Sequence, residues 1–145
     1  MIQRIQSVYL LIAAALAAFL GIYNPHLWRA QMVNNAYKYF SGQSNYGYFA
    51  LTLVIILLAL VCIFLFKKRK LQYRLTVLNV FLSIGWIVLQ YFLIDWKKAD
   101  LIQHMDSATY LPAAFIPIPV IILLFLAARG IRKDEKLIKT LDRLR

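Results

Sequence analysis

Four long apolar segments most limit how this 145-residue chain can fold. A helix needs about 20 mainly apolar residues to cross the hydrocarbon core of a membrane. Each segment meets that length, and none contains Asp, Glu, Lys or Arg away from its borders. We therefore predict an all-α integral membrane protein, a four-helix bundle in up-down-up-down order, because short connections join antiparallel neighbours. The predicted spans are residues 5–23, 46–66, 75–94 and 111–128.

The first segment also resembles a secretory signal peptide, because Arg4 precedes an alanine-rich apolar run. No polar cleavage region precedes Asn24, however, and there is no lipobox cysteine. We therefore expect residues 5–23 to be retained as a span. The chain then divides into a four-span unit, residues 1–128, and a basic tail, residues 129–145.

The basic residues predict the orientation of the chain. Although the net charge is +11, the chain is 62% hydrophobic and its Lys and Arg stand beside the apolar segments. This pattern favours membrane topology over nucleic-acid binding. Of the 17 basic residues, 13 lie at the N-terminus, between spans two and three, or in the tail. The positive-inside rule therefore predicts a multi-pass protein with both termini in the cytoplasm.

The third span carries a polar stripe. Its members follow one another at spacings of three, four and seven residues, which keeps them on one face of a helix together with Trp86. They are Thr76, Asn79, Ser83 and Gln90. Polar groups in hydrocarbon need partners, so we expect this face to look inward or toward another protein and to form hydrogen bonds between helices. The alternative is a path for a solute, although pumps usually place ionisable residues in the membrane.

Spans one and four contain helix-packing signals. Ala13, Ala17 and Gly21 recur every four residues, which predicts close helix contact within the chain or, alternatively, an oligomerisation face. In span four, Pro112 suits a first helical turn. Pro117 and Pro119 cannot donate backbone hydrogen bonds, so they predict a kink or a delayed start of the helix.

The two remaining connections, residues 24–45 and 95–110, contain no recognisable catalytic motif. We interpret their aromatic residues as membrane-interface anchors. They are Tyr23, Trp28, Tyr37, Tyr39, Tyr46, Trp96 and Tyr110. His26 and His104 stand near Asp100 and Asp106, but without the paired spacing of metal ligands, so solvated loop residues are the better interpretation. We predict no catalytic, cofactor-binding or metal-binding residues.

The tail has the pattern of an amphipathic helix that continues span four. At about 100° per residue, five aliphatic residues share an arc of about 140°: Ile131, Leu137, Ile138, Leu141 and Leu144. Acidic residues on and beside this arc fit a protein contact better than an anionic lipid surface or a solvated flank. We predict that the tail docks against protein through Arg4, Ile131, Asp134, Leu137, Ile138, Leu141 and Asp142. Its acidic residues should face basic groups among Arg4, residues 67–70 and Arg74, or basic groups on a partner.

The opening MIQRIQSVYL and the ending AARGIRKDEKLIKTLDRLR resemble the two ends of a family of small four-span proteins from Bacteroidota. That family is known as a domain of unknown function, number 4293. The resemblance implies a bacterial cytoplasmic (inner) membrane and supplies no activity, cofactor or catalytic residue.

These observations predict a non-enzymatic accessory or stabilising subunit of a larger membrane protein complex. Its expected partners are membrane lipids and other membrane proteins. The alternative is a small transporter or channel that uses Asn79, Ser83 and Gln90.

Overall fold

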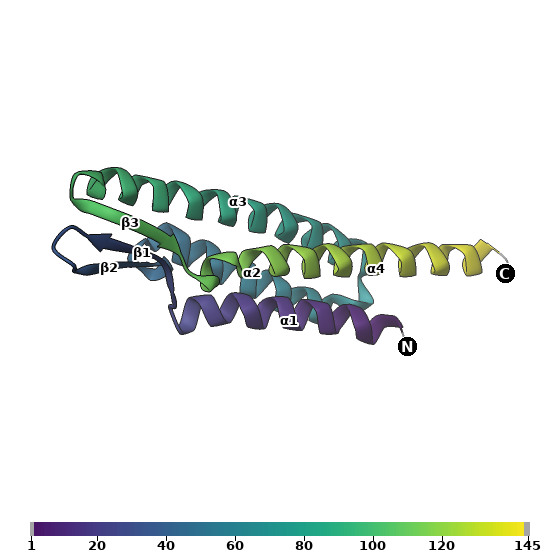
Figure 1. Cartoon of the computed structure of the whole chain (residues 1–145). Coiled ribbons are helices and arrows are strands. Elements are labelled where there is room, and N and C mark those ends of the chain that lie inside the picture. The colour runs from purple at the N-terminus through teal and green to yellow at the C-terminus, as the bar shows by residue number, and fades with distance from the viewer. Residues whose placement is uncertain (1, 144–145) are drawn as a thin grey trace.

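The structure, a computed structural model, describes residues 2–143 of the chain. Within this range it leaves out the side chains of residues 2–4, 43, 67, 138, 139 and 141–143. Most described residues are helical, and a small antiparallel sheet stands at one end of the molecule (Figure 1). The prediction of an all-α fold is therefore wrong in that a sheet is also present.

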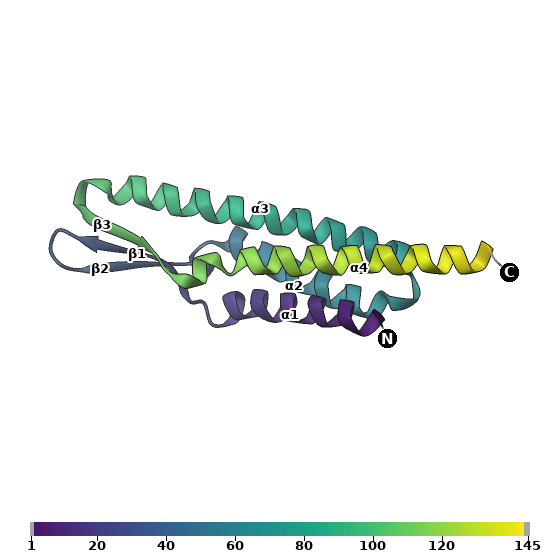
Figure 2. The same ribbon diagram turned by 45° about the vertical axis from the view of Figure 1, so that its right-hand side comes forward.

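Four long helices lie side by side, and each packs against two neighbours: α1 and α3 both contact α2 and α4 (Figures 1 and 2). They are α1 (Ile2–Ile22), α2 (Tyr46–Phe64), α3 (Arg69–Leu101) and α4 (Pro117–Arg143). All four are long and apolar enough to cross a membrane. Successive helices run in opposite directions, so both termini lie at one end, the terminal end, and the sheet lies at the other, the sheet end.

The longest helix, α3, extends beyond the predicted span 75–94 in both directions. Its 33 residues give a length of about 50 Å at 1.5 Å per residue. The hydrocarbon core of a membrane is only about 30 Å thick. The charged residues near the two ends of α3, among them Arg69 and Lys98, therefore stand outside an apolar layer of that thickness.

The small residues of α1 lie where helices come closest. Ala13, Ala14 and Ala17 are buried, and a Cβ at Gly21 would stand 3.4 Å from Cγ2 of Thr52 in α2. Helices in lipid associate through close packing of this kind. The stripe thus forms a contact within the chain.

Proline determines where α4 begins. Residues Pro112–Phe115 form a short 3₁₀ helix, η4, with Pro112 in its first turn, and α4 begins only at Pro117. Pro117 and Pro119 lack the N–H groups that would continue the earlier turns. The structure therefore shows a delayed start of the helix.

The connections 24–45 and 95–110 fold together into a three-stranded antiparallel sheet of order β2-β1-β3. The strands are β1 (His26–Met32), β2 (Tyr37–Ser41) and β3 (Met105–Tyr110), and three further 3₁₀ helices are η1 (Gly42–Ser44), η2 (Leu65–Lys67) and η3 (Ile102–His104). Arg29 in the central strand pairs with Tyr39 on one side and Thr109 on the other. The sheet therefore ties two connections that are far apart in sequence.

A tight turn and buried side chains explain why β1 and β2 form. In the turn, Asn35 has a φ of 60°, a left-handed conformation that Asn tolerates better than most residues. The N–H of Met32 donates to the carbonyl of Ala36 at 2.8 Å. Leu27, Trp28 and Ala30 of β1 are buried. Trp28, only 1% exposed, is thus a core residue rather than the interface anchor that we predicted.

Candidate functional site

The terminal end contains a carboxylate inside the protein. Asp134 of α4 lies in the charged tail segment, yet it is only 6% exposed. Burial of an unpaired carboxylate costs on the order of several kcal/mol. The partners of Asp134 therefore decide whether α4 can pack at this position.

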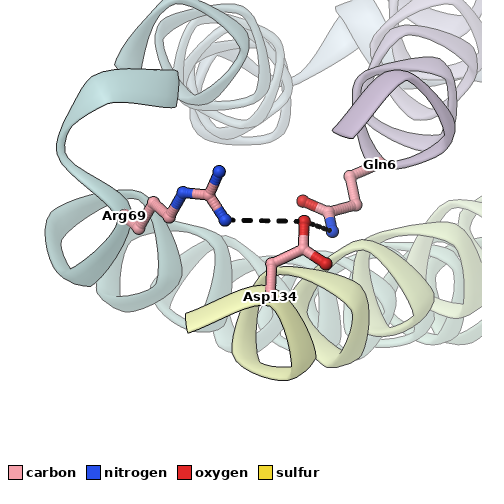
Figure 3. A network of polar contacts seen from close by, with 3 residues as sticks. All are labelled: Gln6, Arg69 and Asp134. Atoms are coloured by element: carbon pink, nitrogen blue, oxygen red, sulfur yellow. Dashed lines mark hydrogen bonds and ion pairs between the residues drawn. The ribbon is translucent and has the colours of Figure 1, made fainter. Parts of the chain in front are cut away.

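Two side chains from other helices meet Asp134 (Figure 3). The Gln6 amide of α1 donates from Nε2 to Asp134 Oδ2 at 2.7 Å. Nη1 of Arg69, the first residue of α3, lies 3.7 Å from the same oxygen. The first contact is a short, charge-assisted hydrogen bond, and the second is an ion pair that is too long for a hydrogen bond. One carboxylate therefore links α1, α3 and α4.

A glycine allows Gln6 to reach Asp134. Gly130 lies one turn before Asp134 on α4, and a Cβ at Gly130 would stand 2.8 Å from Cγ of Gln6. Such a distance is too short for two carbon atoms, so a larger residue would displace Gln6. Glycine lowers helix stability by about 1 kcal/mol relative to alanine. At this position, the absence of a side chain leaves room for the hydrogen bond between α1 and α4, in spite of that loss of helix stability.

The start of α3, and with it Arg69, is held by the turn between α2 and α3. Nε2 of Gln72 donates to the carbonyl of Cys62 at 2.9 Å, and the Cys62 thiol points back to the carbonyl of Gln72 at 4.0 Å. The N–H of Lys68 donates to the carbonyl of Leu65 at 3.0 Å. These contacts position the Arg69 side chain beside Asp134.

A cavity of about 20 Å³ adjoins Asp134 and has room for about one water molecule. It is lined by Gln6, Ser7, Phe66, Arg69, Gln72, Ile131 and Asp134. Within this lining, the Asp134 carboxylate contacts the Gln6 amide and the Arg69 guanidinium, which come from two other helices. Their arrangement can hold α4 in register with α1 and α3.

The tail residues that we predicted to contact a partner occupy different positions. Ile131, 1% exposed, and Asp134 are buried against the chain's own helices. Leu137 is 47% exposed. The side chains of Arg4, Ile138, Leu141 and Asp142 lie outside the described residues.

The tail is helical, as predicted, because α4 continues to Arg143. Its last turns extend past the start of α1 and past the connection between α2 and α3 (Figures 1 and 2). Leu137 and Thr140 are exposed in this part of the helix, which we call the projecting end of α4 (residues 136–143).

The polar stripe of α3 is buried inside the chain. Thr76, Asn79 and Ser83 are all 0% exposed, and Gln90 is 6% exposed. The hydroxyls of Thr76 and Ser83 donate to the carbonyls of Gln72 and Asn79, one turn earlier in the same helix, each at 2.8 Å. These two hydroxyls are satisfied locally.

The two amides of the stripe reach other elements. Nδ2 of Asn79 donates to the carbonyl of Ile55 in α2 at 3.1 Å. Gln90 accepts from the hydroxyl of Tyr48 in α2 at 3.0 Å and donates to the carbonyl of Ala114 in η4 at 2.9 Å. The stripe therefore fastens α3 to α2 and, near the sheet end, to the residues before α4.

The histidines of the sheet end occupy separate surroundings. His26 stacks on Tyr39, with ring centroids 4.6 Å apart. His104 lines an open cavity of about 780 Å³ together with Lys38 and Asp100. Among the residues that the structure describes, no three His, Cys, Asp or Glu side chains gather in a way that could hold a metal ion.

Sequence reasoning missed three parts of these sites: Gln6, Gly130 and Gln72. Gln72 was recognisable, because its four-residue spacing to Thr76 extends the polar stripe towards the terminal end. It fell outside the predicted span only because α3 is longer than the apolar segment. The contact between Gln6 and Gly130 joins residues more than a hundred positions apart, and no local pattern signals it.

Comparisons with known proteins identify the family. A search of curated proteins and a search of solved structures each gave no match. One family model matches residues 2–144, which is nearly the whole chain. The chain therefore belongs to the family described as a domain of unknown function, DUF4293.

Proposed function

We propose that this protein is a non-enzymatic accessory subunit that stabilises a larger membrane protein complex and contacts its partner through the projecting end of α4. The observation that carries the proposal is the exposure of Leu137 on a helix that extends beyond its neighbours. An apolar side chain that is exposed there favours a protein contact, in which aliphatic burial contributes about 1.5–3 kcal/mol per fully buried side chain.

The Asp134 contacts support this role because they hold the base of the projecting end. Gln6 and Arg69 fix α4 one turn before Leu137. A helix held at its base loses less conformational freedom when a partner binds, so binding is more favourable. The buried carboxylate therefore presents the projecting end in one direction.

We further propose that the four helices span a bacterial cytoplasmic membrane as a bundle with both termini in the cytoplasm. The positive-inside rule supports this orientation, because 13 of the 17 basic residues belong in the sequence to the N-terminus, the connection between α2 and α3, or the tail. Cysteine labelling tests it. In intact cells, a membrane-impermeant thiol reagent should label Asn34→Cys and not Lys133→Cys, both in a Cys62→Ala background. The reverse pattern would invert the topology.

Transport through the polar stripe is the alternative function. It is the weaker proposal, because the two amides already bond to α2 and η4 and the hydroxyls bond within α3. A solute path along Asn79, Ser83 and Gln90 would have to compete with these contacts.

Site-specific photo-crosslinking in native membranes tests the accessory role. A photoreactive amino acid at Leu137 should give one discrete protein adduct, and the same group at Ile122, a half-exposed residue in the apolar part of α4, should not. The adduct, identified by mass spectrometry, should reach a constant amount as expression of the chain rises, because the partner is then limiting.

Leu137→Asp is the variant that should lose the partner contact, and Lys136→Ala, at an exposed neighbouring position, is the control. We expect Leu137→Asp to abolish copurification of the crosslinked protein in mild detergent and Lys136→Ala to preserve it. If Leu137 gave no protein adduct and the chain purified alone from native membranes, the accessory role would be wrong.

A further inference from the structure

A groove lies between α3 and α4 near the terminal end. Its volume of about 310 Å³ is at the lower limit of the roughly 300–1,000 Å³ found for ligand sites. Tyr73, Val77 and Phe81 line it from α3, and Phe125, Arg129 and Arg132 line it from α4. Phe81 is 66% exposed and Phe125 is 59% exposed, so the groove opens outward from the helices.

The groove crosses the boundary between charged and apolar sequence on both helices. On α4, Arg129 is the first charged residue after the apolar stretch 111–128. On α3, Arg74 is the last charged residue before the apolar stretch 75–94. When these helices cross a membrane, the arginines of the groove lie at headgroup depth. The aliphatic and aromatic lining then lies beside the acyl chains.

The charge of the groove is one-sided. Arg129 and Arg132 are exposed, and the Arg132 guanidinium lies 6.0 Å from the centroid of the Tyr73 ring, within cation–π range. The described lining contains no Asp or Glu. Arginine binds phosphate oxygens in a bidentate manner, and basic pockets between membrane helices suit anionic headgroups.

We propose that this groove binds one anionic phospholipid. Arg129 and Arg132 contact the phosphate and the anionic headgroup, and one acyl chain lies against Val77, Phe81 and Phe125. The second arginine favours a lipid with net negative charge over a zwitterionic lipid, whose own cation competes for the phosphate. The proposal does not depend on the protein partner, because the groove is formed by α3 and α4 alone.

Native mass spectrometry of the full chain in detergent tests the site, with phosphatidylglycerol as the probe. We expect one phosphatidylglycerol per chain, bound at least about tenfold more tightly than phosphatidylcholine with the same acyl chains. Glycerol phosphate, which has the headgroup chemistry without the chains, should not displace it. Displacement by glycerol phosphate, or equal binding of both lipids, would overturn the proposal.

Two double variants distinguish lipid binding in the groove from attraction of lipid by general surface charge. A basic residue near an anionic surface contributes roughly a factor of five to binding. We therefore expect R129Q/R132Q to weaken phosphatidylglycerol binding about 20-fold. K133Q/K136Q removes the same charge from the next turn of α4 and should change binding less than about twofold. Equal losses in the two double variants would mean that surface charge, not the groove, binds the lipid.

A further variant tests whether the apolar part of the groove contacts an acyl chain. Val77→Phe fills the groove and leaves both arginines in place, so it should weaken phosphatidylglycerol binding about tenfold. Val88→Phe adds the same bulk elsewhere on α3, at an exposed position, and should leave binding unchanged. Helix content and thermal midpoints of all variants should match the parent. Unchanged lipid binding in a folded Val77→Phe protein would contradict the acyl-chain contact.

Discussion

The two ends of the molecule are held together by different kinds of contact. At the sheet end, the ladder of β1 with β2 and β3 joins distant connections, and Trp28 is buried with almost no exposed surface. At the terminal end, a single carboxylate meets one amide and one guanidinium. Backbone ladders and apolar burial carry no net charge, whereas the Asp134 contacts depend on charge and on the reach of one side chain.

This difference indicates which end of the molecule a change in one side chain can alter. A sheet and a buried indole are lost only when a whole region unfolds, because many contacts act together. The Asp134 contacts at the terminal end involve three side chains, and a change in any one of them alters how the projecting end is held. Of the two ends, the terminal end is therefore the one whose contacts a single substitution can change.

The largest effect is expected at the sheet end. Trp28→Ala removes a fully buried side chain, and replacements of this kind cost about 3–5 kcal/mol. Trp96→Ala, at a position that is 78% exposed, should cost less than about 0.5 kcal/mol. Thermal unfolding in detergent measures both. Equal midpoints for the two variants would mean that the sheet end does not contribute a stable core.

At the terminal end, Asp134→Ala should cost about 2 kcal/mol. It leaves the buried Gln6 amide without its acceptor, a loss of about 1–3 kcal/mol, and removes an ion pair whose partner Arg69 is partly exposed and so contributes at most about 1 kcal/mol. Asp134→Asn keeps an acceptor for Gln6 and should cost about half as much.

Asp106→Ala, at an exposed position of β3, is the matched control for loss of a carboxylate and should have little effect. Denaturation at low and high salt adds a second measurement, because salt screens the Arg69 contact and leaves Trp28 burial unchanged. An Asp134→Ala protein as stable as the parent would remove the distinction between the two ends.

The helices were predictable from sequence because length and apolarity alone specify a spanning helix. The inward face of α3 was predictable for a similar reason, since the spacing of Thr76, Asn79 and Ser83 determines which residues share a helix face. Both signals are local, and each rests on many residues. Burial of the amides followed from the cost of leaving them unpaired in hydrocarbon.

The sheet and the Asp134 partners were not predictable in the same way. The strands are short, and β1 pairs with β3 across two intervening helices, so no local period reveals the pairing. Trp28 resembles an interface anchor until the sheet shows that it is buried. Asp134 was predicted to face basic residues, among them Arg69, but the role of Gly130 depends on how closely Gln6 crosses α4.

A smaller and more specific effect is expected at Gly130. Alanine should stabilise α4 by about 1 kcal/mol through helix propensity, but its Cβ would stand 2.8 Å from Cγ of Gln6 and break a buried hydrogen bond that contributes about 1–3 kcal/mol. We therefore expect Gly130→Ala to destabilise the protein by about 1 kcal/mol.

In a Gln6→Ala background, Gly130→Ala should instead stabilise the protein, because the obstructing side chain is gone. Urea unfolding of the four proteins in this double-mutant cycle measures the coupling. If Gly130→Ala stabilised the parent as much as it stabilises Gln6→Ala, the hydrogen bond at the terminal end would not depend on the glycine.

The smallest effect is expected midway between the ends, at Asn79. Its Nδ2 donates to the carbonyl of Ile55, whereas its Oδ1 has no partner among the described residues. Polar contacts between membrane helices average about 0.6 kcal/mol, and Asn79→Leu also removes the unpaired oxygen. The variant should therefore lose no more than about 0.6 kcal/mol. Gln90→Leu, which loses contacts with both Tyr48 and Ala114, should lose about twice as much.

Thermal midpoints in detergent and solute flux in liposomes, measured on the same Asn79→Leu protein, separate the structural role of Asn79 from transport. A structural amide predicts a small decrease in the midpoint and no flux in either the parent or the variant. A solute path predicts flux in the parent that the variant loses, with the midpoint unchanged, because the amide would then bind solute rather than α2. That second result would replace the accessory role with transport and would place the functional site between the two ends.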